Sequence, residues 1–428
     1  MKVMKKLLFL SMVTIFATTS VFAQKSVLRD AKRSLKSNDL NEARTLIKQA
    51  IEDAETANDP ETWKVFGDIG DKAFDNERTK EMLSQNANEQ VMYDGLLESY
   101  RPYVKADSLG EIPNAKGKVK NKFRKEIQGK LKANHQFYIN GGIFYNDKQD
   151  FAKATQFFET FWDIPTLTMF EGSKDAFVLD STYQTIKYYA IITAIQGKNH
   201  DKALSLLKRA ANEPFIENSA FQESDIYELM ASEYMQMGDT VKYVETLYAG
   251  ADRFPKSKYF IPNLVNVFIR NGENDKAMEY LDTAIKNDPS NACDLNSVKG
   301  ALLAEKGDFK GAEEEYKKAL VQDENCERAL EALAVNYILQ AQDLKEVTAT
   351  ISDRKEQVEN DKKTIELYVK SLPYLEKFAD KLADRNADTT ELDGALMKLR
   401  NVYYNLSMLG VDKSKELEKV EEQLGVSN

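Results

Sequence analysis

A 34-residue period dominates the middle of this sequence and limits the folds open to it. Three consecutive segments align on a Gly-Asp or Gly-Glu dipeptide, and each is 34 residues long: 224–257, 258–291 and 293–326. A fixed period of this length is typical of a helix–turn–helix unit that buries its apolar face only against a neighbouring copy. We therefore expect the 428 residues to form many stacked hairpins rather than several globular cores.

Within the three segments, small residues recur where the two helices of a hairpin would cross. Positions 8, 20 and 27 read Ala231, Val265, Gly300; Tyr243, Ala277, Ala312; and Gly250, Ala284, Ala319. Position 32 is Pro255 and Pro289 in the first two segments, where proline would stop the second helix. This pattern resembles the tetratricopeptide repeat, with Val265 and Tyr243 as departures. The resemblance implies an all-α, right-handed superhelical solenoid of helical hairpins.

The same pattern extends more loosely through the rest of the chain. We divide the sequence into a leader, divergent N-terminal helical repeats, central repeats, the regular array, and an interrupted repeat with C-terminal capping helices: 1–23, 24–110, 111–223, 224–340 and 341–428. Residues 341–364 lack Gly and Pro and are expected to extend a helix, with a disordered loop as the alternative. The interrupted repeat followed by a cap resembles exported tetratricopeptide proteins of Bacteroidetes-type bacteria.

The first 23 residues have the pattern of a secretory signal peptide. Three lysines precede an uncharged run from Leu7 to Ala23, and cleavage is expected near Ala23. That run is too short for a stable membrane span, which needs about 20 apolar residues. Cleavage removes three of the 59 basic residues, so 56 remain against 69 acidic ones, a net charge of -13. The sequence therefore predicts an exported protein of the periplasm or cell envelope.

Cys293 and Cys326 are the two cysteines of the chain. An exported protein can join them in a disulfide. Alternatively, they are unpaired residues at equivalent ends of neighbouring repeats, where we expect a separation of about 10 Å against the roughly 5.5 Å between Cα atoms that a bridge requires. The sequence leaves both possibilities open.

Repeats of this family usually bind partners along the concave face, which the first helix of each hairpin lines. The resemblance places partner-binding side chains at Glu228, Ser232, Met235, Tyr259, Asn263, Asn266 and Ile269. The Lys and Arg that some family members use to hold a peptide carboxylate are missing from the corresponding positions. This mixture of apolar and weakly polar groups favours an extended or helical protein segment.

One basic run stands out in the acidic chain. It holds Lys116, Lys118, Lys120, Lys122, Arg124 and Lys125, and continues to Lys132 with only Glu126 opposing it. The run is either a docking patch for a polyanion or acidic protein, or a solvated connector before the next helix. Because Phe123 is its only aromatic residue and the whole chain is acidic, we expect no nucleic-acid partner.

Reactive side chains are scarce. His135 and His200 are the only histidines, both are expected to be exposed, and neither has metal-ligand spacing. No nucleophile-elbow, zinc-protease or phosphate-loop motif is present, so no catalytic residue, metal or cofactor is predicted. Aromatic pairs such as those at 157–158 and 161–162 favour repeat core over a carbohydrate platform. The loop 167–174, with Met169 and Phe170, is expected to add apolar surface at the mouth of a groove.

The sequence thus favours a non-catalytic protein that binds or scaffolds a protein partner, whose identity and stoichiometry it does not specify. The alternative is a glycan-binding protein of an outer-membrane polysaccharide-utilisation system, motivated by the aromatic content and the export signal.

Overall fold

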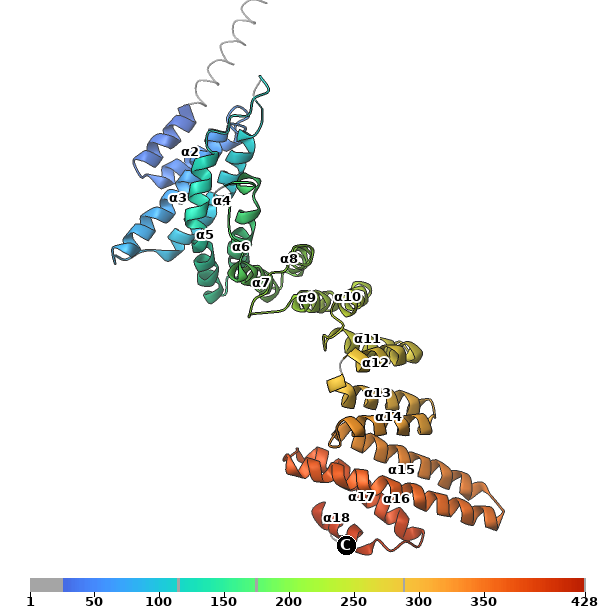
Figure 1. Cartoon of the computed structure of the whole chain (residues 1–428). Helices are drawn as coiled ribbons and strands as arrows, with labels where there is room; N and C mark the ends of the chain where they lie inside the picture. The colour runs from blue at the N-terminus through green and yellow to red at the C-terminus, as the bar shows by residue number, and fades with distance from the viewer. Residues whose placement is uncertain (1–25, 114–115, 174–175, 288, 427–428) are drawn as a thin grey trace, which may run out of the picture. The chain divides into compact units, whose positions relative to one another are not determined.

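The computed structural model describes residues 26–113, 116–173, 176–287 and 289–426. Over these ranges every regular element is a helix and no strand occurs, so the all-α prediction is confirmed (Figure 1). The proposed leader, residues 1–23, lies outside the described residues. Among the helices that are described, none has both the length and the apolar character to cross a membrane.

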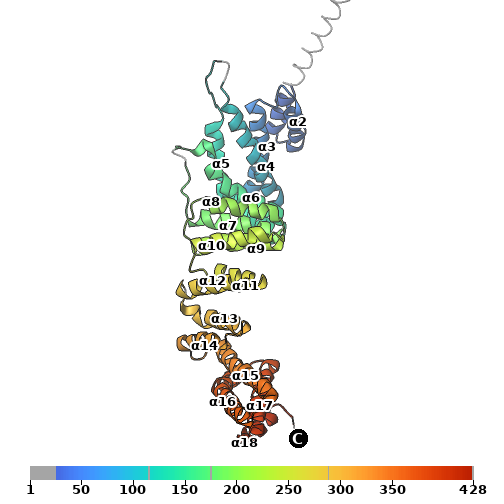
Figure 2. The ribbon, with the colours of Figure 1, turned by 90° about the vertical axis from the view of Figure 1, so that its right-hand side faces the viewer.

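The helices form two compact units that divide within α9 (Glu223–Gln236). The N-terminal unit ends at Glu233 and begins with a helical stretch over residues 26–36. Its further helices are α2 (Leu40–Glu52), α3 (Pro60–Met82), α4 (Glu89–Gly110), α5 (Arg124–Asp147), α6 (Phe151–Asp163), the 3-10 turns η1 (Ile164–Thr166) and η2 (Thr168–Phe170), α7 (Ser181–Gln196) and α8 (His200–Asn212). Successive helices of this unit pack side by side (Figure 2).

The C-terminal unit begins at Tyr234 and continues the hairpin pattern. Its helices are α10 (Thr240–Arg253), α11 (Phe260–Arg270), α12 (Asn274–Asn287), the 3-10 turn η3 (Pro289–Asn291), α13 (Ala292–Glu305), α14 (Phe309–Gln322), α15 (Glu327–Thr350), α16 (Arg354–Asp384), α17 (Thr389–Met408) and α18 (Ser414–Gln423). From α10 onward each helix packs against the next, and α13 also contacts α15. Thus α13 and α15, the first helices of two successive hairpins, stack directly.

The recurring Gly-Asp dipeptide is explained by the turn inside each hairpin. Gly238 and Gly307 take a left-handed backbone, with φ of 74° and 80°, and each ends the first helix. The side chains of the following Asp239 and Asp308 then accept a backbone N–H at the start of the second helix. Glycine adopts this φ without a Cβ clash, and aspartate satisfies a donor that the helix leaves open.

The small residues of the repeat pattern lie at the helix crossings, as predicted. Ala231, Ala277 and Ala312 are fully buried. At Gly300, an added Cβ would lie 2.5 Å from the Tyr316 ring. Small side chains at these positions therefore let the large ring of the partner helix reach the backbone.

The interrupted repeat is a long helical hairpin. The helix α15 continues to Thr350 and α16 begins at Arg354, so most of 341–364 is helical. The N-terminal half of α15 and the C-terminal half of α16 pack into a core with α17 and α18. Val420 is the one buried residue of α18. The remaining face of α18 is polar, as a terminal capping helix requires.

Candidate groove of the N-terminal unit

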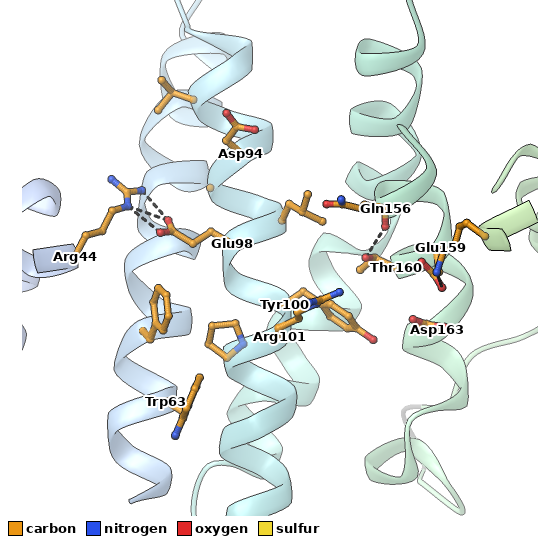
Figure 3. Close-up of a pocket in the computed structure, with 16 residues that line it drawn as sticks. Arg44, Trp63, Asp94, Glu98, Tyr100, Arg101, Gln156, Glu159, Thr160 and Asp163 are labelled. Carbon is orange, nitrogen blue, oxygen red and sulfur yellow. Dashed lines mark hydrogen bonds and ion pairs between the residues drawn. The ribbon is translucent and has the colours of Figure 1, made fainter. Parts of the chain in front are cut away.

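A groove of about 850 Å³ opens on the N-terminal unit, along α4 and between its neighbours α2, α3 and α6 (Figure 3). Its apolar and aromatic lining is Trp63, Phe66, Val91, Leu97, Tyr100 and Pro102. The rest of the lining is Gly95 and nine polar or charged residues, so the groove offers both apolar area and convergent polar groups to a ligand.

Two glycines bring α3 and α4 together beneath the groove. A Cβ on Gly95 would lie 2.7 Å from the carbonyl oxygen of Gly70, and one on Gly70 would lie 2.6 Å from that of Gly95. This close approach sets α4 beside the helix that carries Trp63 and Phe66, whose ring centroids are 6.4 Å apart. The Trp63 indole N–H donates to the carbonyl of Ala57 at 2.6 Å, which fixes the orientation of the ring.

Ion pairs between different helices neutralise the carboxylates that line the groove. The pairs are Glu98 with Arg44 (2.8 Å), Asp94 with Lys153 (2.8 Å), Glu159 with Lys202 (2.5 Å) and Asp163 with Arg209. Burial raises the pKa of the Asp163 carboxyl, and the Arg209 contact opposes that rise. These pairs tie α2 to α4, α4 to α6, and α6 to α8, so the groove has a defined width.

A buried cluster behind the groove holds α6 against α7 and α8. Lys187 is 2% exposed, and its Nζ lies 2.7 Å from Glu213 and 5.1 Å from the centroid of the Trp162 ring. The Trp162 indole N–H donates to the same Glu213 carboxylate at 2.9 Å. A buried charge without a partner would destabilise the folded protein. The ion pair with Glu213 therefore allows Lys187 to be buried beside Trp162.

Two hydrogen-bond donors of α4 in the groove have no partner among the residues that the structure describes. Within the described part of the chain, neither the Tyr100 hydroxyl nor the Arg101 guanidinium has a hydrogen bond or ion pair. Both project from α4 toward the helix that bears Thr160 and Asp163 (Figure 3). Burial raises the pKa of Tyr100, and the Asp163 carboxylate adds to the rise, so the hydroxyl stays protonated and can donate.

The residues predicted for partner binding lie elsewhere. Glu228, Ser232 and Met235 follow one face of α9, with Met235 exposed, while Asn266 is exposed on α11 and Ile269 is half-buried there. None of the seven lines the N-terminal groove.

The Asn263 side chain, a member of that predicted set, makes hydrogen bonds within the protein. The Asn263 side chain accepts from the Tyr243 hydroxyl at 3.2 Å and donates to the Tyr259 carbonyl at 2.7 Å. The first bond joins α10 to α11 within the C-terminal unit, and the second lies within the first turn of α11.

The residues of the basic run differ in their exposure and contacts. Lys116, Lys118, Lys120, Lys122 and Lys125 are exposed. In contrast, the Arg124 guanidinium donates two bonds to the Asp107 carboxylate, both at 2.8 Å, and these contacts raise its pKa. Arg124 therefore anchors the start of α5 to the end of α4 and does not extend the exposed patch.

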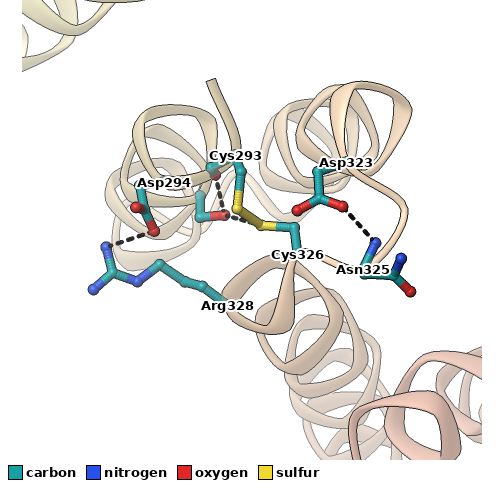
Figure 4. Close-up of a disulfide and its surroundings, with 7 residues drawn as sticks. Cys293, Asp294, Asp323, Asn325, Cys326 and Arg328 are labelled. Atoms are coloured by element: carbon teal, nitrogen blue, oxygen red, sulfur yellow. Dashed lines mark hydrogen bonds and ion pairs between the residues drawn. A yellow bond between two sulfur atoms is a disulfide. The ribbon is translucent and has the colours of Figure 1, made fainter. Parts of the chain in front are cut away.

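The two cysteines form a disulfide (Figure 4). Their Cα atoms are 5.9 Å apart, closer than the distance of about 10 Å expected from equivalent repeat ends. The reason is that Cys293 lies in the first turn of α13 and Cys326 immediately precedes α15, and these two helices are neighbours.

Two expectations about exposure were wrong. The His135 ring stacks on Phe161 with centroids 3.9 Å apart, and its Nε2–H donates to the Phe161 carbonyl at 2.8 Å. Burial lowers the pKa of His135 to about 4. Met169 and Phe170 are buried beside α5 rather than exposed at a groove mouth.

The aromatic pairs mostly fill the core, as expected, since Phe157, Phe158, Phe161 and Trp162 are all buried. Among the described residues, no group of His, Cys, Asp or Glu could hold a metal ion.

The comparison with protein families decides the identity of the repeat. Residues 263–291, which cover most of α11 and all of α12, match the family profile of the tetratricopeptide repeat. This chain contains a tetratricopeptide repeat. The resemblance predicted from the sequence is thereby confirmed, and the matched tetratricopeptide unit belongs to the regular array of the C-terminal unit.

The chain is also similar to several solved structures. Among them are PilW, a widely conserved type IV pilus biogenesis factor (16% identity, 57% of this chain and 93% of that chain, TM-score 0.33); YrrB, a TPR protein with an unusual peptide-binding site (16%, 49% and 97%, 0.31); and a tetratricopeptide repeat protein from Parabacteroides merdae (14%, 57% and 98%, 0.31). No curated protein matches in sequence. At these TM-scores, the similarities carry no conclusion about function.

The groove escaped the sequence analysis because its helices are out of phase with the 34-residue period. The one signal was Trp63 followed by Phe66 and Gly67, which matches the opening of a tetratricopeptide repeat. Gly67 lies at a close helix crossing, because a Cβ added to it would lie 2.4 Å from the Tyr103 ring of α4. The close approach of Gly70 and Gly95, which sets α4 beside α3, has no counterpart in the repeat pattern.

Proposed function

We propose that this protein is a non-catalytic scaffold that binds a segment of another protein in the groove of its N-terminal unit. The observation that carries the proposal is the groove itself, which has Trp63, Phe66 and Tyr100 in its lining and free donors on α4. Because interhelical ion pairs preset its walls, the groove needs little ordering on binding, and most of the entropic cost falls on the partner.

We further propose that the protein works after export, in the periplasm or cell envelope. The basic start and apolar run before Ala23 support this location. The Cys293–Cys326 disulfide supports it independently, because such bonds persist in oxidising compartments and are rare in the cytosol.

Site-specific photo-crosslinking in cells tests the groove. Val91 lines the groove and is 44% exposed, whereas Val178 is 88% exposed outside it. We expect a photoreactive residue at Val91 to crosslink to a defined envelope protein, and the same residue at Val178 to give no such product. Equal products from both positions, or none from Val91, would contradict binding in this groove.

A further inference from the structure

Arg101 is the one charged residue of the groove lining without an internal counter-ion among the described residues. The four lining carboxylates each contact a cation from another helix, and those contacts also engage the lining cations Arg44 and Lys202. The exposed Arg101 guanidinium has no such contact. The ion pairs within the described part of the protein thus leave the positive charge of Arg101 unpaired in the groove.

The surroundings of Arg101 are apolar on α4 and polar on α6. The neighbouring Tyr100 and Pro102 face the groove, and Trp63 and Phe66 lie across on α3. Gln156 on α6 is exposed in the same groove. A bound segment can therefore place a large apolar side chain on the aromatic rings and offer its backbone carbonyls to the Tyr100 hydroxyl and the Gln156 amide.

The sign of the charge on the bound segment follows from which groups already have partners. A cationic side chain would meet Arg101 directly and could reach a carboxylate only by competing with an existing ion pair. An anionic side chain would pair with Arg101 without breaking any contact, and a planar guanidinium can hold a carboxylate through two hydrogen bonds. Because the chain as a whole has a net charge of -10, this selectivity must come from the local contact and not from the long-range field.

From these contacts we infer that the groove selects a protein segment that carries an Asp or Glu side chain close to an aromatic or branched aliphatic one. The acidic side chain pairs with Arg101, and the apolar side chain packs on Trp63 and Phe66. This inference rests on the proposed function, since it names the chemistry of the segment that the same groove binds.

A charge reversal tests the inference. A display library of random linear peptides is selected against the full chain without its leader, in parallel with Arg101→Glu and with Lys72→Glu. The second variant makes the same change in charge at an exposed residue of α3 outside the groove. We expect the unaltered chain and Lys72→Glu to enrich Asp or Glu next to an apolar residue, and Arg101→Glu to enrich Lys or Arg at that position.

The affinity of one enriched peptide completes the test. Changing its acidic residue to the amide is expected to weaken binding to the unaltered chain about 10-fold and to leave binding to Arg101→Gln unchanged. If Arg101→Glu enriches the same acidic peptides, the inference is overturned while peptide binding in the groove stands. If the unaltered chain enriches no peptide above the display background, the proposed function fails together with the inference.

Discussion

At the scale of the residue, the turn of each hairpin needs a left-handed backbone, and glycine does not always supply it. Gly307 has a φ of 80° and Lys198 one of 54°, and both residues precede a helix N-cap. A side chain in this conformation costs roughly 1 kcal/mol, whereas glycine adopts it freely.

We therefore expect Lys198→Gly to stabilise the protein and Gly307→Ala to destabilise it, each by about 1 kcal/mol. No heavy atom lies within 4 Å of the Cβ that Gly307→Ala would add, so the effect would come from the backbone alone. The measurement is the midpoint of thermal unfolding. Gly394→Ala in the open interior of α17 is the control and should raise the midpoint, because alanine favours a helix. The backbone explanation fails if Gly307→Ala behaves like Gly394→Ala.

The half-buried His135 gives a prediction of pH dependence. Its pKa in the folded protein is about 4, below the ordinary value of 6.5, so the unfolded chain takes up the proton first as the pH falls. The contribution of His135 to stability is complete above about pH 6.5 and is lost between 6.5 and 4, by up to about 3 kcal/mol. Unfolding by urea at several pH values should show a shallower dependence in His135→Gln than in the unaltered protein. Identical slopes would rule out a lowered pKa of His135 in the folded protein.

At the scale of the helix, the crossing of α3 and α4 determines whether the groove forms. In Gly95→Ala the added methyl group would meet the Gly70 carbonyl oxygen at 2.7 Å and the Ala73 Cβ at 2.9 Å. We expect the helices to separate, with a loss of about 1–3 kcal/mol in the free energy of unfolding and weaker binding in the groove. Gly129→Ala in α5, where nothing lies within 4 Å, is the matched control and should have neither effect. Unfolding curves and peptide affinity together make the test, and unchanged values for Gly95→Ala would refute the close crossing.

The disulfide acts on two neighbouring elements. It joins the start of α13 to the residue before α15 and closes a loop that spans the α13–α14 hairpin, with a sequence separation of 33. Closing a loop of this size stabilises a protein by about 2–4 kcal/mol, mainly by restricting the unfolded chain.

Reduction by dithiothreitol should therefore lower the melting temperature of the unaltered protein. The double variant Cys293→Ser, Cys326→Ser should melt at the lower temperature with or without the reductant. If reductant lowers the melting temperature of the double variant equally, the effect comes from something other than this bond.

At the scale of the whole molecule, the sequence was sufficient for the repeat and insufficient for the groove. Positions 8, 20 and 27 predicted the helix crossings because small residues such as Ala277 and Ala312 recur at fixed spacing. The groove depends instead on contacts between helices without a shared period, such as the ion pair of Arg44 with Glu98, 54 residues later. His135 was misjudged for the same reason, since its burial depends on Phe161 of the following helix and not on its own neighbours in sequence.

The clearest repeat signal and the proposed binding groove lie in different units of the chain. The clearest tetratricopeptide signal lies at 263–291 in the C-terminal unit, and sequence reasoning placed the binding site beside it. The groove lies in the divergent N-terminal unit.

Hydrogen–deuterium exchange of the chain with and without its crosslinked partner tests this account most directly. If the partner occupies the groove, protection on binding should concentrate in α3, α4 and α6, around Trp63, Arg101 and Gln156. The contradicting result is protection confined to the C-terminal unit, along the face that carries Asn266 and Ile269, with α4 unchanged.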